Sequence, residues 1–130
     1  MHANEEMLRN VYDAFAKRDM PMVFSRFSDD ITFRVPGEGS MSGSYVGKDE
    51  VQAYFGKMRN RSGGTFTIEL LDVLANDRHG VVLTIERAES GGRALENPTV
   101  HVWDLQDGIC TSFIGYDDGT WDAFWRDEVA

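Results

Sequence analysis

Apolar residues recur at helical spacing three times in the first half of the chain. They occupy positions i, i+3, i+4 and i+7, which places them on one face of an α-helix. The first helix is expected to start near Asn4 and to end at Arg18. Asp19 is expected to cap the second, and Asp49 opens a third that ends at the Ser62 glycine cluster. The three apolar faces are Leu8, Val11, Tyr12 and Phe15; Met20, Val23, Phe24 and Phe27; and Val51, Tyr54, Phe55 and Met58.

From residue 65 the pattern changes to one apolar residue in two, which is typical of half-buried β-strands. Turn residues such as Asp107 and Gly108 separate the runs, and each connection is too short for a crossover helix. The long strands are therefore expected to be antiparallel. Including a short early strand that ends before Pro36, the predicted strands are 31–35, 65–75, 79–89, 93–105 and 109–116.

Helices followed by antiparallel strands predict an α+β fold, with the helices packed on one face of the sheet. A chain of 130 residues is expected to form a single domain over 1–130. Residues 37–47 are rich in glycine and serine and are predicted to form a loop. A final helical turn is expected to start at Thr120 and to carry Trp121, Phe124 and Trp125.

Composition narrows the classes of partner. The chain has 22 acidic and 13 basic residues and a formal net charge of -9. Nucleic acids and anionic membrane surfaces attract clustered Lys and Arg, so we expect neither as a partner. The one cysteine, Cys110, fits a reducing compartment, and a cytoplasmic location is expected. His2, His79 and His101 are too scattered for a recognisable metal site, so no metal is expected.

The strongest candidates for chemistry lie in the last predicted hairpin. His101 sits in an apolar strand beside Trp103, and the partner strand leads into Asp117. On one face of the sheet, the imidazole and the carboxylate would form an acid/base pair. Two alternatives remain: His101 as a core histidine satisfied by a neighbouring hydroxyl, and Asp117 as a strand end in solvent.

The register of this hairpin decides whether His101 and Asp117 can pair. A strict two-residue turn at Asp107 and Gly108 would put Tyr116 on the face of His101. A type I turn with Gly108 as a bulge would put Asp117 there instead. We favour the bulge because it gathers more apolar side chains on one face. It would pair Leu105 with Ile109 and His101 with Phe113, with Trp103 and Asp117 on the same side.

Four stretches of the sequence resemble one protein family. They are YDAFAKRD (12–19), FSDDITF (27–33), GSYVGKDEV (43–51) and VHVWDLQDGI (100–109). Together with the order of elements, they resemble the SnoaL-like, ketosteroid-isomerase-like branch of the nuclear transport factor two-like superfamily. The resemblance implies a cone-shaped, strongly curved antiparallel or mixed sheet wrapped around the three N-terminal helices, with a deep apolar pocket. It also implies a homodimer formed through the outer sheet face.

The resemblance further implies roles for particular residues. Asp117 falls where SnoaL-like cyclases place an aspartate that removes a proton next to a carbonyl group. His101 aligns with the position of an oxyanion donor in ketosteroid isomerases. For Tyr12 and Tyr54, which would bind substrate, plain packing is the competing interpretation. The residues expected to bind substrate are Phe33, Val35, Tyr12, Tyr54, Phe55, Phe66, Trp103 and Phe113.

The sequence also departs from the family pattern. Ketosteroid isomerases carry their base just before the proline that ends the first strand, and here that residue is Val35. An isomerase using that base is therefore not expected. An epoxide hydrolase of this fold uses an inward Asp–Arg–Asp arrangement, which has no residue-by-residue match here. Glu86 and Arg87 are neighbours in mid-strand, so one of them must point inward.

These observations support three hypotheses. The first is an enzyme of the polyketide cyclase, isomerase or dehydratase type. It would use acid/base chemistry without a cofactor on a small hydrophobic carbonyl compound, with Asp117 as base. The second is a non-catalytic protein that binds a hydrophobic metabolite. The third is a protein-interaction module that uses the outer sheet face.

Overall fold

The computed structural model describes residues 1–126, which form four helices and one six-stranded sheet. The strand order is β2-β1-β6-β5-β4-β3; β1 is parallel to β6, and every other pair is antiparallel. The elements in chain order are α1 (Ala3–Ala16), α2 (Met20–Ser25), β1 (Phe27–Val35), β2 (Gly43–Val46), α3 (Lys48–Ser62), β3 (Thr67–Ala75), β4 (His79–Ser90), β5 (Arg93–Gln106), β6 (Ile109–Tyr116) and α4 (Thr120–Arg126).

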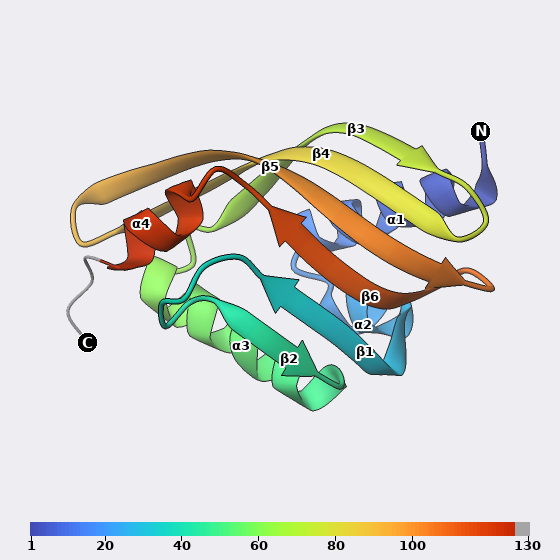
Figure 1. Cartoon of the computed structure of the whole chain (residues 1–130), viewed down its shortest axis with the longest axis horizontal. Helices are drawn as coiled ribbons and strands as arrows, with labels where there is room; N and C mark the ends of the chain where they lie inside the picture. The colour runs from blue at the N-terminus through green and yellow to red at the C-terminus, as the bar shows by residue number, and fades with distance from the viewer. Residues whose placement is uncertain (127–130) are drawn as a thin grey trace.

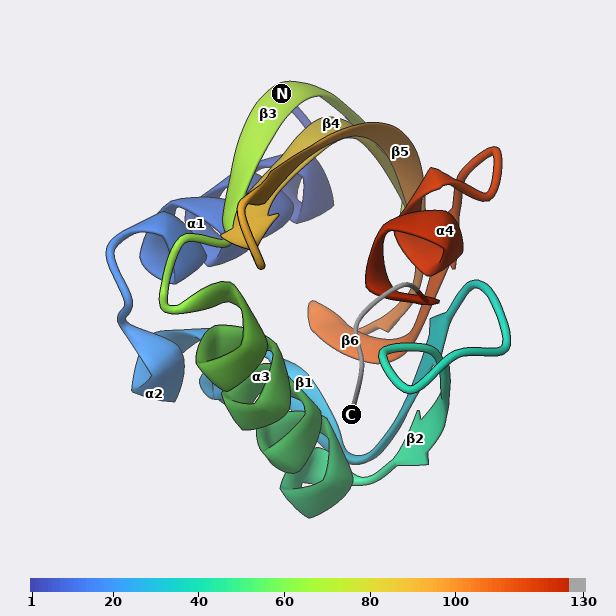
Figure 2. The ribbon, with the colours of Figure 1, turned by 90° about the vertical axis from the view of Figure 1, so that its left-hand side faces the viewer.

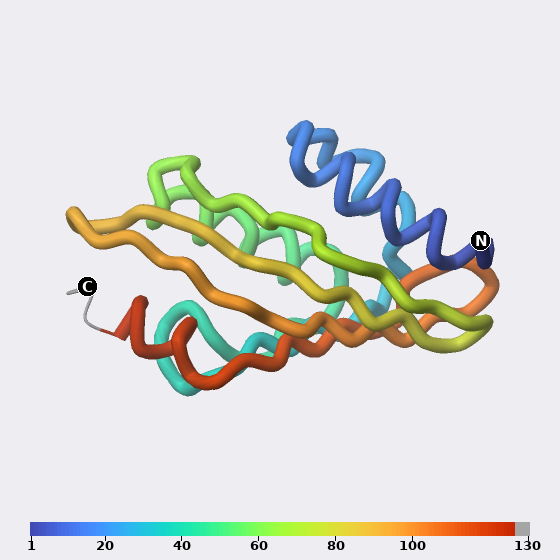
Figure 3. Tube along the Cα trace, turned by 90° about the horizontal axis from the view of Figure 1, so that it is seen from above, coloured from blue at the N-terminus to red at the C-terminus, as the bar shows by residue number. Residues whose placement is uncertain are grey.

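The sheet curves strongly, and α1, α2 and α3 close the open side of the curve (Figure 1; Figure 2). This is the predicted α+β arrangement, with a mixed, cone-like sheet around the helices. Seen from above, β3, β4 and β5 cross the molecule side by side, and α4 lies at the end opposite the N-terminus (Figure 3). None of the helices within residues 1–126 is long and apolar enough to cross a membrane.

Local signals place the helices, with one correction. Asp19 caps α2 as predicted, since its side chain accepts from the backbone N–H of Met22 at 3.3 Å. The cap of α1 is His2, and the prediction of Asn4 is wrong. Asn4 is the second residue of α1 and is buried, and its Nδ2 donates to the carbonyl of Asn76 at 2.9 Å. Tertiary contact therefore outweighs the capping preference of this residue.

The predicted loop over 37–47 contains a strand that the pattern does not predict. β2 is four residues long and pairs with the end of β1, with Tyr45 opposite Phe33. Its sequence carries no apolar run. It forms a strand because it pairs with β1 at the edge of the sheet. β1 itself begins at Phe27, earlier than predicted, since its first residue already pairs with Cys110 of β6.

The β5–β6 hairpin follows neither predicted register. Asp107 and Gly108 both have positive φ, as a two-residue type I′ turn requires, so the bulge predicted at Gly108 is wrong. The extra residue is Thr111, because Leu105 pairs with Cys110 whereas Asp104 pairs with Ser112. Because of this bulge, the residues of β6 after Thr111 alternate between the inner and outer faces of the sheet as predicted. Trp103 lies opposite Phe113 and His101 opposite Gly115, but Cys110 replaces Ile109 on the inner face.

The β4–β5 hairpin extends beyond the end of β6 (Figure 1). The last β5–β6 pair is Val100 with Tyr116, so β5 is an edge strand before that point. Pro98 lies in this edge segment, where its missing N–H removes no ladder bond to β6. The inner face of the extended hairpin carries Glu86 and Asn97, which are opposite one another.

Candidate active site

A pocket opens between the concave face of the sheet and the helices. Its walls come from α1, α2, α3, α4, β1, β3, β4, β5 and β6, and the space between them is about 700 Å³, including the part that opens to solvent. Most of the lining is apolar. The eight residues expected to bind substrate all lie in this lining: Tyr12, Phe33, Val35, Tyr54, Phe55, Phe66, Trp103 and Phe113.

Aromatic rings hold the walls of the pocket in place. Phe33 and Phe113 stack at 4.1 Å between centroids, and Trp103 meets Phe113 edge-on at 4.8 Å. Phe55 lies edge-on to Phe33 at 5.5 Å from the helix side. Such pairs contribute about 0.5–1.5 kcal/mol each beyond the area they bury. These ring contacts therefore hold the side chains of the pocket wall in fixed positions.

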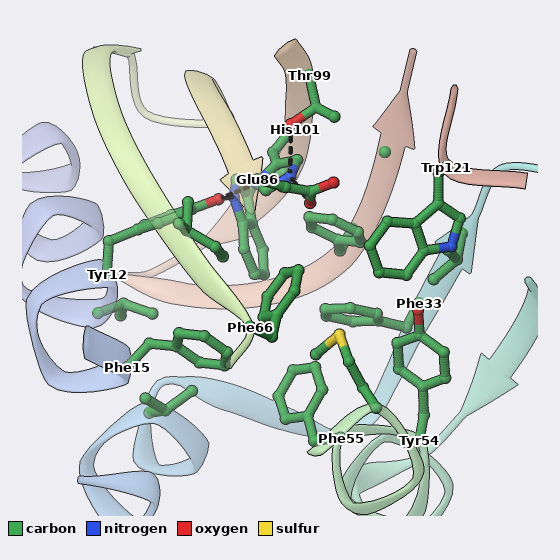
Figure 4. A pocket seen from close by; sticks show the side chains of 18 of the residues that line it. Tyr12, Phe15, Phe33, Tyr54, Phe55, Phe66, Glu86, Thr99, His101 and Trp121 are labelled. Atoms are coloured by element: carbon green, nitrogen blue, oxygen red, sulfur yellow. Dashed lines mark hydrogen bonds and ion pairs between the residues drawn. The ribbon is translucent and has the colours of Figure 1, made fainter. Parts of the chain in front are cut away.

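A chain of hydrogen bonds crosses one wall of the pocket (Figure 4). The indole Nε1 of Trp103 donates to the hydroxyl of Tyr12 at 3.0 Å, and this hydroxyl lies 2.6 Å from Nδ1 of His101. The other ring nitrogen, Nε2, lies 3.0 Å from Oε2 of Glu86 and 3.2 Å from Oγ1 of Thr99. Residues from α1, β4 and β5 thus form one polar network.

The network indicates which ring nitrogen of His101 carries the proton. The oxygen of Tyr12 already accepts from Trp103, so its own proton needs an acceptor. Nδ1 of His101 is that acceptor, which leaves the proton of a neutral ring on Nε2, facing Glu86. Every donor then has a partner, and the chain of donors ends on the carboxylate.

Glu86 is the acidic member of this network and reaches the pocket. Its side chain is 13% exposed, against 3% for His101. Glu86 lines the pocket, and the carboxylate projects beside His101 in Figure 4. Asn97, which is fully buried, directs its Nδ2 towards Oε1 of Glu86 at 3.5 Å. Each oxygen of Glu86 therefore has a nitrogen donor near it, which suits a carboxylate because its oxygens only accept hydrogen bonds.

Asp117 does not form the expected pair with His101. Its Oδ2 accepts from Nδ2 of Asn97 at 3.0 Å and from the backbone of Trp121 at 2.9 Å, and its Oδ1 accepts from the backbone of Gly119. Its place on the inner side agrees with the predicted alternation. Its contacts are nevertheless those of a turn and helix-start residue, and it is not among the side chains that line the pocket. Two residues, Asn97 and Glu86, separate it from the imidazole.

Burial fixes the protonation of the two phenols in the pocket wall. Desolvation raises the pKa of both Tyr12 and Tyr54 well above 10.0. Both are therefore hydrogen-bond donors at neutral pH and cannot serve as bases. The hydroxyl of Tyr54 donates to the carbonyl of Met41 at 3.1 Å, and the same carbonyl accepts from Nε1 of Trp121 at 2.8 Å.

The remaining candidate residues from the sequence are not part of the hydrogen-bond network around His101. Val35 lines the pocket where ketosteroid isomerases carry a base, and its apolar side chain makes that role impossible. Arg87 points outward and pairs with Glu69, so Glu86 is the inward member of that neighbouring pair. Within residues 1–126, no group of three or more His, Cys, Asp and Glu side chains is arranged to hold a metal ion.

The family model described as the SnoaL-like domain matches residues 8–113, most of the chain. The chain belongs to the SnoaL-like domain family. A protein of Mycobacterium tuberculosis described as uncharacterised is 28% identical to this SnoaL-like chain over 126 residues, which cover 95% of the chain and 96% of the relative.

Solved structures agree with this assignment. Bal32a, from a soil-derived mobile gene cassette, is 29% identical with a TM-score of 0.89, covering 95% of this chain and 96% of that one. An NTF2-like protein of unknown function from Burkholderia pseudomallei is 26% identical with a TM-score of 0.86, and each chain is fully covered. An LEH-like epoxide hydrolase of M. tuberculosis shares the fold at 17% identity, with a TM-score of 0.74 over 93% of this chain and 86% of that one. The SnoaL-like chain thus has the NTF2-like fold.

Sequence reasoning did not assign Glu86 to the site. The signal was nonetheless present, because a charged pair in mid-strand forces one side chain inward, and Glu86 shares its parity with the buried residues Val82, Thr84 and Ala88. Asn97 carried no such signal, since an Asn next to Pro98 suggests a turn.

Proposed function

We propose that this SnoaL-like chain is an enzyme that moves a proton on a small hydrophobic carbonyl compound, with Glu86 as the proton acceptor. The observation that supports it is one carboxylate in an apolar pocket, held by a buried imidazole at 3.0 Å. An apolar pocket that holds a few convergent polar groups is the usual form of a small-molecule site.

The reaction needs one proton acceptor close to the substrate. Glu86 takes the proton next to the carbonyl group, the C–H bond breaks, and its electron pair forms an enolate. The protonated carboxyl group then returns the proton to another carbon or to an oxygen. Isomerisation needs these two steps alone. In aldol cyclisation the enolate carbon first attacks a second carbonyl carbon, and the resulting alkoxide takes the proton. In dehydration the enolate expels a β-hydroxyl group, which takes the proton and leaves as water.

His101 acts through Glu86 in this proposal. Tyr12 and Glu86 occupy its two ring nitrogens, so it orients the carboxylate rather than meeting the substrate. The role of base moves from Asp117 to Glu86, because Glu86 lines the pocket. Asp117 is assigned to hold Asn97 and the start of α4.

Tyr54 is assigned to the substrate oxygen. It lines the pocket, it keeps its proton because burial raises its pKa, and it is not part of the Tyr12–His101 chain. Its present acceptor is a backbone carbonyl, that of Met41. A donor of this kind stabilises the negative charge that develops on an enolate oxygen.

Proton exchange tests this function without the natural substrate. We expect the protein to accelerate exchange of the protons next to the carbonyl of 1-tetralone into D₂O, followed by NMR. Glu86→Gln should slow this exchange by about a hundredfold or more. Glu89→Gln, an exposed position on the same strand, is the matched control and should not change it.

Two outcomes would contradict the proposal. Unchanged exchange in Glu86→Gln would remove this residue as the base. Binding of the ketone by calorimetry with no exchange in the wild-type protein would instead favour the alternative, a non-catalytic protein that binds hydrophobic small molecules.

We also propose a homodimer formed through the outer sheet face. Apolar side chains gather there in register across three strands, and Tyr116 is 53% exposed. An exposed apolar patch of this kind favours protein association. The residues of this outer patch are Val81, Leu83, Val100, Val102, Ile114 and Tyr116.

A further inference from the structure

We infer that the pocket selects its ligands by charge: it takes uncharged carbonyl compounds, is blocked by amines on the same ring system, and rejects carboxylates. This inference rests on the proposed function, since Glu86 is the residue that both would use. It adds to that function the charge of the ligand that the pocket accepts.

The charges around the pocket have one sign. Within residues 1–126, no Lys or Arg is among the side chains that line it, and Glu86 is the one carboxylate there. The hydrogen on Nε2 of His101 already points at Glu86, so the imidazole does not offer that donor to a second anion. The hydroxyl of Tyr54 is then the donor left for an anionic ligand, and it is uncharged. Such a ligand would enter without a counter-ion, which is costly in an apolar site.

The two donors nearest to Glu86 do not satisfy it fully. Oε2 lies 3.0 Å from His101, but among residues 1–126 the contact of Oε1 is the one with Asn97 at 3.5 Å. One lone-pair direction of Oε1 is thus weakly used. An electropositive group on a ligand, either the polarised C–H beside a carbonyl or an ammonium N–H, fits this position.

The aromatic walls favour the same choice of charge. Phe33, Phe113 and Trp121 line the pocket, and aromatic rings attract cations through their faces. The net charge of -9 adds a long-range field that repels anions and attracts cations. An amine therefore gains from both the carboxylate and the rings, whereas an acid gains from neither.

The test compares one ring system with three end groups. We would titrate 2-naphthylmethylamine, 2-naphthalenemethanol and 2-naphthoate into the protein at pH 7 by calorimetry. The amine is expected to bind at least about tenfold more tightly than the acid, with the alcohol between them. The amine should also inhibit the exchange of 1-tetralone protons competitively.

Matched variants show whether Glu86 causes the selection. In Glu86→Gln, the affinity ratio of amine to acid should fall below about threefold, while the alcohol binds as before. Glu89→Gln removes the same charge from an exposed position and should keep the wild-type ratio. If Glu86→Gln does not fold, the ratio in the wild-type protein still decides.

Each remaining outcome overturns a different statement. Equal or tighter binding of 2-naphthoate would overturn selection by charge and leave the proposed proton transfer standing. Selection that persists in Glu86→Gln would overturn the assignment to this residue. If none of the three compounds binds, selection by charge falls. If 1-tetralone protons also fail to exchange, the proposed function falls with it.

Discussion

Glu86 and His101 meet at 3.0 Å although neither is the strand partner of the other. Glu86 lies opposite Asn97, and His101 lies opposite Val82. Between them is the pair of Thr84 and Thr99, whose hydroxyls contact each other. The carboxylate and the imidazole therefore meet across the position of this threonine pair, and Figure 4 shows Glu86, His101 and Thr99 together at one wall of the pocket.

Replacing His101 should destabilise the fold. In His101→Phe, the proton of Tyr12 and the carboxylate of Glu86 lose their buried partner. We expect the free energy of unfolding to fall by about 2–4 kcal/mol in urea titrations. The exposed His79→Phe is the control and should change it by less than about 0.5 kcal/mol. Equal effects of the two changes would contradict the hydrogen-bonded network.

Stability should decrease at high pH. Burial raises the pKa of Cys110 from 9.0 to about 12 and that of Tyr12 and Tyr54 well above 10.0. Above pH 9 the unfolded chain releases these protons while the folded chain keeps them, so the free energy of unfolding falls as pH rises. Urea titrations from pH 8 to 11 measure the slope. Tyr54→Phe should make it shallower, and an unchanged slope would argue against burial of this phenol.

Cys110 should not react with thiol reagents in the folded protein. It is fully buried, and its raised pKa keeps the thiol protonated at neutral pH, whereas the thiolate is the reactive form. We expect no labelling by 5,5′-dithiobis(2-nitrobenzoate) at pH 8 until urea unfolds the chain. Rapid labelling without denaturant would show that the β6 side of the core opens.

Asp117→Asn should loosen α4 with only a moderate effect on exchange activity. The amide keeps one of the two oxygens that accept from Asn97, Gly119 and Trp121. We expect a loss of about 1 kcal/mol in the free energy of unfolding. Proton exchange should fall by less than about tenfold, far less than in Glu86→Gln. A loss of activity equal to that of Glu86→Gln would return the base to Asp117.

A charge on the outer patch should separate the proposed homodimer. Val100→Asp puts a carboxylate at the centre of the apolar outer face, next to Leu83 and Tyr116. We expect light scattering after size-exclusion chromatography to change from dimer to monomer. Thr67→Asp, an exposed position on β3, is the control and should leave the mass unchanged. A monomeric wild-type protein would contradict this proposal.

The spacing of apolar residues predicts most of the helices and strands. The helical faces of α1, α2 and α3 and the alternation of β3 to β6 follow directly from residue spacing, since burial of one face imposes a period. The elements it misplaced have weak local signals. β2 lies in a Gly/Ser-rich stretch and exists because β1 offers it an edge. The Thr111 bulge has no residue signature and depends on how β5 and β6 twist together.

The sequence determined most of the side chains that face inward, because parity along a strand is a local property. It did not determine the Thr111 bulge, which puts Cys110 in place of Ile109 on the inner face. It did not determine which of those side chains touch. The contact between Glu86 and His101 joins positions that are not paired in the sheet, and it depends on curvature and on the space above Thr84 and Thr99. Only the tertiary structure could decide that the imidazole meets Glu86 and not Asp117.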